Sequence, residues 1–172
     1  MINMSGPNDQ HIYIDTFYLQ SFLNGNNDLE RHAKKEFRKA KQLTEKSGEI
    51  FLKIPFIAVA EMINNLNIKV NEKRQKERIV SNLIDLLDQN EKIDLVPAKC
   101  ESFKKAVEIK NQDNRLDDTD ILIIAQALCD PYSSHLLIND SNILESRVID
   151  EVNTNMHRDG NRNRKLRIIE EI

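Results

Sequence analysis

Four acidic residues, spread widely along the chain, occupy positions where their carboxylates could act together. Asp15 and Asp140 each follow an apolar run, Glu61 lies between apolar neighbours, and Asp120 precedes another apolar run. If they met within about 5 Å, each pair would repel by about 3 kcal/mol at an effective dielectric constant of about 20. Such a cluster is stable only when protons or cations neutralise it. Oxygen ligands suit Mg²⁺ or Mn²⁺, and these ions promote the hydrolysis of phosphodiesters.

Each of these carboxylates also has an ordinary structural use. Asp15 and Asp140 could cap the helices that follow them, a role worth about 1 kcal/mol each. Asp120 could complement a helix dipole, and Glu61 could pair with a surface lysine. The cation site is therefore predicted from the coincidence of all four acids and not from any one of them.

The segments that must position these acids alternate between short apolar runs and amphipathic stretches. In the amphipathic stretches the apolar residues recur every three or four positions, which is typical of one face of a helix. The alternation predicts a three-layer α/β/α fold with a central, mostly parallel sheet of four to five strands. Ligands bind beyond the carboxyl ends of parallel strands, so Asp15 and Asp140 should share one crevice. Strands are predicted at residues 11–15, 50–54, 93–96, 135–138 and 166–169, and helices at 16–23, 29–46, 56–67, 70–89, 99–110, 117–128 and 141–152.

Length and composition indicate one globular domain. The chain has 172 residues, 40% of them hydrophobic and 31% charged, which is enough to bury a core without disulfide bonds. We expect a flexible N-terminal tail over residues 1–10 and a single domain over 11–172. Its basic C-terminal segment covers about 153–167, and residues 153–163 are predicted as a loop.

The cysteines and the hydropathy pattern bear on the cellular compartment. Cys100 and Cys129 form no C-x-x-C pair, which argues against a zinc ribbon or a disulfide framework and fits a reducing cytosol. No apolar run reaches the roughly 18 residues of a membrane span, and the first ten residues are polar, unlike a signal peptide. A cytoplasmic protein without a membrane association is therefore expected.

The charges are unevenly distributed. The net charge of −3 argues against a generic basic nucleic-acid binder. Two segments are nevertheless basic: residues 31–46 contain seven cations and two acids, and residues 157–167 contain five cations and one acid. A basic rim around an acidic pocket would suit an enzyme that acts on a phosphate backbone. Solvated helix faces are the alternative explanation for such runs. The candidate RNA contacts are Lys34, Lys35, Arg38, Arg158, Arg162, Arg164 and Lys165.

Four segments in order, IYIDTFYL, IPFIAVAEMI, DDTDILIIAQAL and HLLIND, resemble the PIN-domain family of ribonucleases, which includes the VapC-type toxins of toxin–antitoxin pairs. The resemblance runs from about residue 12 to 143. It implies a catalytic and metal-binding set that holds Mg²⁺ or Mn²⁺ and consists of Asp15, Glu61, Asp120 and Asp140. The residues expected to support this set are Thr16, Asp118, Asn139 and Ser141.

Two positions depart from the family pattern. Phe17 stands where the family usually has Asn or Ser, and Ile138 stands where Thr or Ser commonly precedes the last acid by two. Both departures remove hydrogen-bonding groups that would orient a ligand, and the loss of such groups typically costs about 10- to 100-fold in affinity or activity.

Two functions of different classes follow from these observations. The first is a metal-dependent endoribonuclease that acts on RNA, in particular a VapC-type toxin. Its expected partners are an antitoxin or other regulatory protein and a second copy of the chain in a homodimer. The alternative is a catalytically weak or inactive PIN-like module that binds RNA or protein, which Phe17 and Ile138 favour. A phosphatase-type domain is disfavoured, because Phe17 occupies the place of its second aspartate.

Overall fold

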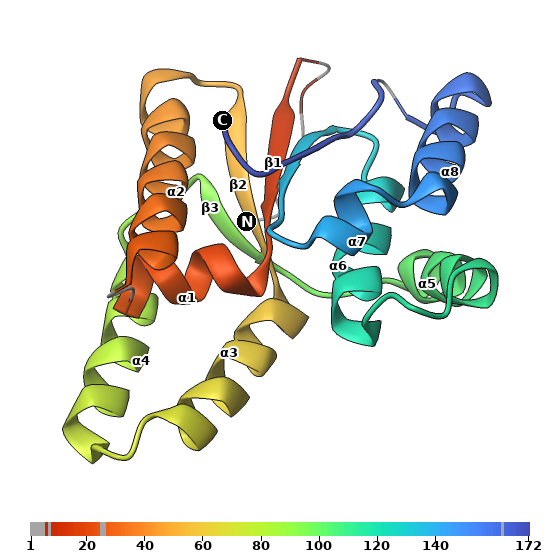
Figure 1. Cartoon of the computed structure of the whole chain (residues 1–172). Coiled ribbons are helices and arrows are strands. Elements are labelled where there is room, and N and C mark those ends of the chain that lie inside the picture. The colour runs from red at the N-terminus through yellow and green to blue at the C-terminus, as the bar shows by residue number, and fades with distance from the viewer. Residues whose placement is uncertain (1–5, 7, 25–26, 163) are drawn as a thin grey trace.

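The chain folds around a five-stranded sheet in which every strand runs parallel to its neighbours (Figure 1). A computed structural model describes residues 6, 8–24, 27–162 and 164–172, without the side chain of Lys69. The strand order is β3-β2-β1-β4-β5. The strands are β1 Gln10–Ile14, β2 Ile50–Pro55, β3 Ile93–Val96, β4 Ser133–Leu137 and β5 Arg167–Ile169.

Helices cover both faces of this sheet (Figure 1), which confirms the predicted three-layer α/β/α fold. α1, α2 and α4 pack on one face, whereas α5, α6 and α8 pack on the other, and α3 contributes to both cores. The helices are α1 Thr16–Asn24, α2 Asp28–Lys46, α3 Phe56–Lys69, α4 Lys73–Asp88, α5 Cys100–Gln112, α6 Asp118–Cys129, α7 Ser141–Leu144 and α8 Arg147–Arg158.

The two cores follow from the alternation of side chains along the strands. In β1, Ile12 and Ile14 lie in the core under α1 and α2, whereas Tyr13 lies in the core under α6. Because successive side chains of a strand point to opposite faces, a central strand needs apolar residues at consecutive positions. The run Ile12–Ile14 meets this requirement, and it carries Asp15 to the carboxyl edge of the sheet.

The predictions for the C-terminal third were partly wrong. The single helix predicted over residues 141–152 is two helices, because Ser146 interrupts it and caps α8 by accepting a hydrogen bond from the Ile149 amide. The loop predicted over 153–163 is helical as far as Arg158. Asn153 is buried there and hydrogen-bonds both the amide and the carbonyl of Leu166, a tertiary contact that its polar sequence context does not reveal.

Both ends of the chain bear on the domain limits. Of the predicted tail, residues 1–5 and 7 lie outside the described residues, and Gln10 already belongs to β1. At the other end, the Tyr18 hydroxyl donates to the Glu170 carbonyl at 2.7 Å, and the Ile172 amide donates to the buried Glu36 carboxylate at 2.9 Å. These contacts support our proposal that residues 11–172 form one domain. Within the part of the chain that is described, no helix has the length and apolar character needed to cross a membrane.

Candidate active site

Asp15 lies at the carboxyl end of β1 and is buried. Its Oδ1 accepts a hydrogen bond from the Tyr18 amide at 3.1 Å, and its Oδ2 accepts one from the Asn139 amide at 3.4 Å. The first bond caps α1 and the second ties the end of β1 to the segment that follows β4. The structural role as a cap therefore exists, and it holds the carboxylate at the edge where the central strands end.

Glu61 is brought to the same place by α3, which begins directly after β2. The hydroxyl of Thr16, the residue next to Asp15, donates to Glu61 Oε2 at 2.5 Å. Thr16 is buried and Glu61 is partly exposed. The hydroxyl predicted to support the acids therefore orients one of them directly.

Asp140 follows β4 and caps the short helix α7. Its Oδ1 accepts hydrogen bonds from the amides of Asn142 at 2.7 Å and Ile143 at 3.4 Å. Because one carboxylate oxygen takes both bonds, the other is left available for a further contact. As with Asp15, the use as a cap and the position at the carboxyl edge occur together.

Asp120 lies in the first turn of α6, and its pKa reports the other acids around it. Burial, and to a smaller extent the negative charges of Asp117, Glu61 and Asp140 in that order, together raise that pKa from 3.8 to about 7. The sequence prediction did not include Asp117, which caps α6 by accepting from the Thr119 amide at 2.8 Å. The run Asp117–Asp120 was the sequence signal that could have identified it.

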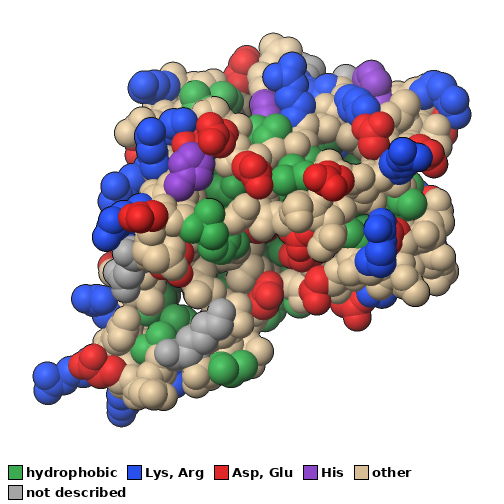
Figure 2. Space-filling model, in the orientation of Figure 1, with side chains coloured by type: hydrophobic (Ala, Val, Ile, Leu, Met, Phe, Trp, Pro, Cys, Tyr) green, Lys and Arg blue, Asp and Glu red, His purple; other side chains and the backbone are tan. Residues whose placement is uncertain are grey.

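The pKa of Asp15 completes the electrostatic picture. The pKa of Asp15 is raised from 3.8 to about 7, mainly by burial; the hydrogen bond from the Tyr18 amide opposes the rise, and the negative charge of Asp120 adds to it. Asp120 is thus within electrostatic reach of Asp15, Glu61 and Asp140, so the structure brings the four predicted acids together. Figure 2 shows Asp and Glu side chains gathered where α1, α3, α6 and α7 approach one another.

A hard divalent cation fits the chemistry of this donor set. All four side chains offer oxygen ligands, and the raised pKa values of Asp15 and Asp120 reflect burial and the charges of nearby acids. Among the described residues, however, no three side chains are already arranged to hold one ion.

The remaining predicted supporting residues contribute unequally. Asn139 acts through its backbone amide, as described above. Asp118 is exposed and pairs with Lys110 at 2.8 Å, so it turns away from the acids. Ser141 is exposed in the first turn of α7. Phe17 packs edge-on against Tyr18 at a centroid distance of 5.8 Å, and Ile138 is fully buried, so neither offers a polar group to the site.

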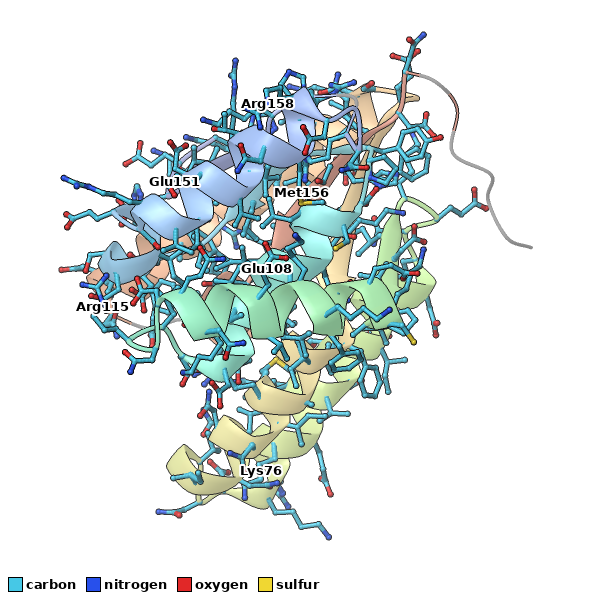
Figure 3. All side chains as sticks on the ribbon, turned by 90° about the vertical axis from the view of Figure 1, so that its right-hand side faces the viewer. Lys76, Glu108, Arg115, Glu151, Met156 and Arg158 are labelled. Atoms are coloured by element: carbon cyan, nitrogen blue, oxygen red, sulfur yellow. The ribbon has the colours of Figure 1, made fainter. Side chains whose placement is uncertain are left out.

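The basic residues do not form the predicted rim. Lys34, Lys35 and Arg38 lie on α2, the helix at the upper left of Figure 1. Arg164 and Lys165 directly precede β5, and parallel strands begin at the edge opposite the one where Asp15 and Asp140 lie. Arg158 lies at the upper end of the molecule in Figure 3. The C-terminal cations are therefore separated from the acids by the length of the sheet.

Arg162 corrects the prediction most clearly, because it is 3% exposed and cannot serve as a surface contact for RNA. Its guanidinium donates to the carbonyls of Ala127, Leu128 and Ser133 at 2.7–2.9 Å. The first two carbonyls belong to the last turn of α6, where helix carbonyls lack partners and carry partial negative charge. Arg162 thus caps the C-terminus of α6.

The sequence prediction did not include two cations that lie close in sequence to Asp120 and Asp140. Arg115 and Arg147 line a cavity of about 610 Å³ between the loop before α6 and the start of α8. Arg115 is held by the buried Asp113, at 2.7 Å from its Oδ2. Isolated arginines in mixed loops carry no sequence signal, and only the approach of the two loops reveals them.

The raised pKa of Asp120 predicts a pH-dependent gain in stability for Asp120→Asn in the presence of EDTA. Because the pKa of about 7 in the folded protein lies above the ordinary value of 3.8, folding takes up a proton, and the free energy of unfolding falls as the pH rises from about 4 to 7. Asparagine removes this cost. The quantity to compare is the free energy of unfolding of the variant minus that of wild type. Since Asp120 is partly exposed, we expect this difference to be about 1–2 kcal/mol larger at pH 8 than at pH 5.

Urea unfolding at the two pH values measures this difference. Asp118→Asn is the matched control, because Asp118 lies in the same helical turn but is exposed. An Asp120→Asn variant that gains no stability at pH 8 would contradict the raised pKa assigned to Asp120.

Three comparisons with known proteins bear on this geometry. The model of the PIN-domain family matches residues 12–145. A similar fold occurs in a structure of VapBC2 from Rickettsia felis bound to a DNA fragment from its promoter, with a TM-score of 0.55, 12% identity, and coverage of 92% of this chain and 98% of that chain. VapC20 of Mycobacterium tuberculosis, a toxin that cleaves the sarcin–ricin loop, is also similar, with a TM-score of 0.56, 12% identity, and coverage of 76% of this chain and 91% of that chain. The fold of FitAcB of Neisseria gonorrhoeae is similar as well, with a TM-score of 0.52, 14% identity, and coverage of 76% of this chain and 88% of that chain. No curated protein sequence matches the chain.

Proposed function

We propose, from the premise that this chain belongs to the PIN-domain family, that it is a metal-dependent endoribonuclease that hydrolyses RNA phosphodiester bonds at its acidic edge. The proposal rests on one observation above all. Asp120 is electrostatically coupled to Asp15, Glu61 and Asp140, and the pKa values of Asp15 and Asp120 are raised to about 7. A fold that keeps four repelling carboxylates together loses stability, which is reasonable only if a cation uses them.

The residues proposed to hold the metal are Asp15, Glu61, Asp120 and Asp140, with Mg²⁺ or Mn²⁺ as the ion. A bound divalent cation would polarise the scissile phosphate and lower the pKa of water for the attack. Asp15 and Asp140 are fixed by backbone amides, and Glu61 is fixed by Thr16. These bonds exist before RNA binds, and they hold the three carboxylates at the edge where the metal is proposed to bind.

Two arginines that lie close in sequence to Asp120 and Asp140 support the use of a polyanionic substrate. Arg115 and Arg147 line the cavity between the loops that carry the starts of α6 and α8. Arginine suits phosphate recognition because its planar guanidinium can donate two parallel hydrogen bonds. We propose that these two side chains hold RNA phosphates beside the scissile bond, while Lys34, Lys35 and Arg38 of α2 remain candidates for more distant contacts.

A VapC-type toxin is the more specific form of this proposal. The similar folds of VapC20 and of the VapBC2 complex support it, and VapC20 is a toxin that cleaves RNA of the sarcin–ricin loop. An antitoxin would then be a natural partner. Large apolar side chains that are exposed, such as Phe56 at 58%, Phe103 at 53% and Val107 at 60%, favour contact with an antitoxin or a second copy of the chain.

A binding module without cleavage is the second candidate function. It is favoured by the burial of Phe17 and Ile138 in apolar surroundings, since neither can orient a ligand or a water molecule. It is also favoured by the lack of three carboxylates already arranged around one ion among the described residues. In this case RNA or protein would bind at the acidic edge or on the basic surfaces without hydrolysis.

Cleavage of a labelled pool of structured and single-stranded RNA separates the two functions. We expect cleavage with Mg²⁺ or Mn²⁺ and none with EDTA. A cation at about 100 times its Kd should stabilise the fold by about 2.7 kcal/mol, which raises the Tm by roughly 5–10 °C for a chain of this size. If neither cleavage nor a rise in Tm occurs with either cation, the chain is a binding module.

A further inference from the structure

A cleft of about 560 Å³ opens where the strands begin, at the edge opposite the acidic site. It is lined by Ser134 and His135 of β4, by Arg167 of β5, and by Arg164 and Lys165 of the preceding loop. In parallel strands all first residues lie at one edge, and His135 pairs with Arg167 in the register of β4 and β5. We name this the amino-edge cleft.

Positive charge dominates the amino-edge cleft. No acidic residue lines it, and among the described residues no carboxylate pairs with Arg164 or Arg167. Lys165 contacts Asp150 at 2.7 Å, but both side chains are largely exposed, so this pair is weak. Burial and the nearby charges of Arg167 and Arg164 lower the pKa of His135. In a protein of net charge −3, this local excess of cations calls for an anionic ligand.

The backbone that carries these cations is held rigidly. The Arg162 Nε donates to the Arg164 carbonyl at 3.1 Å while the rest of its guanidinium is anchored on α6 and Ser133. Asn153 of α8 hydrogen-bonds Leu166 on both sides of its peptide backbone, at 2.8 and 3.0 Å. Buried polar side chains thus fix the loop before and after Lys165. A preorganised cationic loop binds an anion without a large entropic cost for ordering itself.

We propose that the amino-edge cleft is a second RNA-binding site, which holds phosphates of the substrate strand away from the bond that is cleaved. This rests on the proposed function. Two arginines three positions apart on one edge of the sheet, Arg164 and Arg167, suit the repeated phosphates of a nucleic acid strand. β4 is five residues long, so the two edges lie about 17 Å apart. A dinucleotide has a single phosphodiester bond and cannot occupy both sites, whereas a long RNA can.

Binding of RNA can be measured without cleavage. A labelled 20-nucleotide RNA is titrated with Asp120→Asn protein in EDTA at several salt concentrations. Adding Arg164→Gln and Arg167→Gln should weaken binding about 10-fold. Since each lost phosphate contact lowers the salt slope by about 0.7 for single strands, the slope should fall by about 1.4.

The matched control is the pair Arg74→Gln and Arg78→Gln, two exposed arginines of α4 that remove the same charge. We expect a loss of less than twofold from this pair. Equal losses in the two double variants, or unchanged binding by the cleft variant, would overturn the proposal. Arg167→Gln alone, at an exposed side chain, repeats the measurement if the double variant is poorly folded by circular dichroism.

Cleavage kinetics provide an independent arm. In otherwise wild-type protein, the cleft variant should raise KM for the 20-nucleotide RNA about 10-fold, leave its kcat unchanged, and leave kcat/KM for a dinucleotide unchanged. If the wild-type protein cleaves no RNA, the proposed function fails, but the titration in EDTA still shows whether the amino-edge cleft binds RNA. Polyglutamate serves as a competitor that mimics an acidic protein. If it displaces the labelled RNA from the cleft at a lower concentration than unlabelled RNA does, the ligand is an acidic protein and the RNA assignment is refuted.

Discussion

Asp120→Asn is expected to lower kcat for RNA cleavage at saturating Mg²⁺ roughly 100- to 1,000-fold, the usual effect of removing one group that stabilises transition-state charge. Asp120 is the acid on which the charges of Glu61 and Asp140 converge, and it raises the pKa of Asp15 in turn. Its removal therefore takes away the carboxylate that is central to the proposed cation site. Single-turnover cleavage of a labelled RNA with Mg²⁺ in excess measures the effect.

Asp118→Asn is the control for this prediction. Asp118 lies two residues away, carries the same charge, and is turned out to Lys110, so its removal should change kcat by less than about twofold. Equal losses in both variants would indicate a general effect of negative charge at the start of α6. Full activity of Asp120→Asn would remove this residue from the proposed active site.

Arg162→Met is expected to destabilise the fold by about 3 kcal/mol, as is typical when one partner of a buried charged network is removed. The substitution removes the guanidinium donor from the Leu128 carbonyl and one of the two side-chain donors from the Ala127 carbonyl, which keeps the Ser133 hydroxyl, and methionine cannot replace the lost bonds. Burial lowers the pKa of Arg162 to about 10, so the guanidinium remains charged at pH 7. Thermal unfolding should show a fall in Tm of roughly 6–12 °C for a protein of this size.

Arg158→Met is the matched control, because Arg158 is exposed at the end of α8. We expect its effect to stay within about 0.5 kcal/mol. If the two variants unfold at the same temperature, Arg162 does not cap α6 in solution. A large loss in the Arg162 variant alone would show that a residue of the basic segment serves the fold.

Local patterns in the sequence were sufficient for most of the fold. The alternating strands and helices follow from apolar periodicity, and periodicity depends only on neighbours along the chain. The order of the segments around Asp15, Glu61, Asp120 and Asp140 predicted the family, which the match over residues 12–145 confirms. The placement of Asp15 and Asp140 at one edge followed from the rule for parallel sheets, and the structure agrees.

Errors arose where a polar residue makes a contact far away in the sequence. Asn153 and Arg162 lie in a segment whose polar composition is typical of a solvated loop. Asn153 nevertheless hydrogen-bonds Leu166, and Arg162 hydrogen-bonds carbonyls about 30 residues earlier in the chain. Composition describes a residue's solubility and not its partners. The predicted loop and the predicted surface contact were wrong for this reason.

The sequence by itself thus determined the α/β class, the family and the acids that could hold a cation. Only the tertiary structure decided that Thr16 orients Glu61, that burial and mutual repulsion raise the pKa values of Asp15 and Asp120, and that the C-terminal cations lie at the edge opposite the acids. The physical reason is that electrostatic energies depend on burial and on distances in space. Both arise when segments remote in the sequence pack together, and neither is encoded in any single segment.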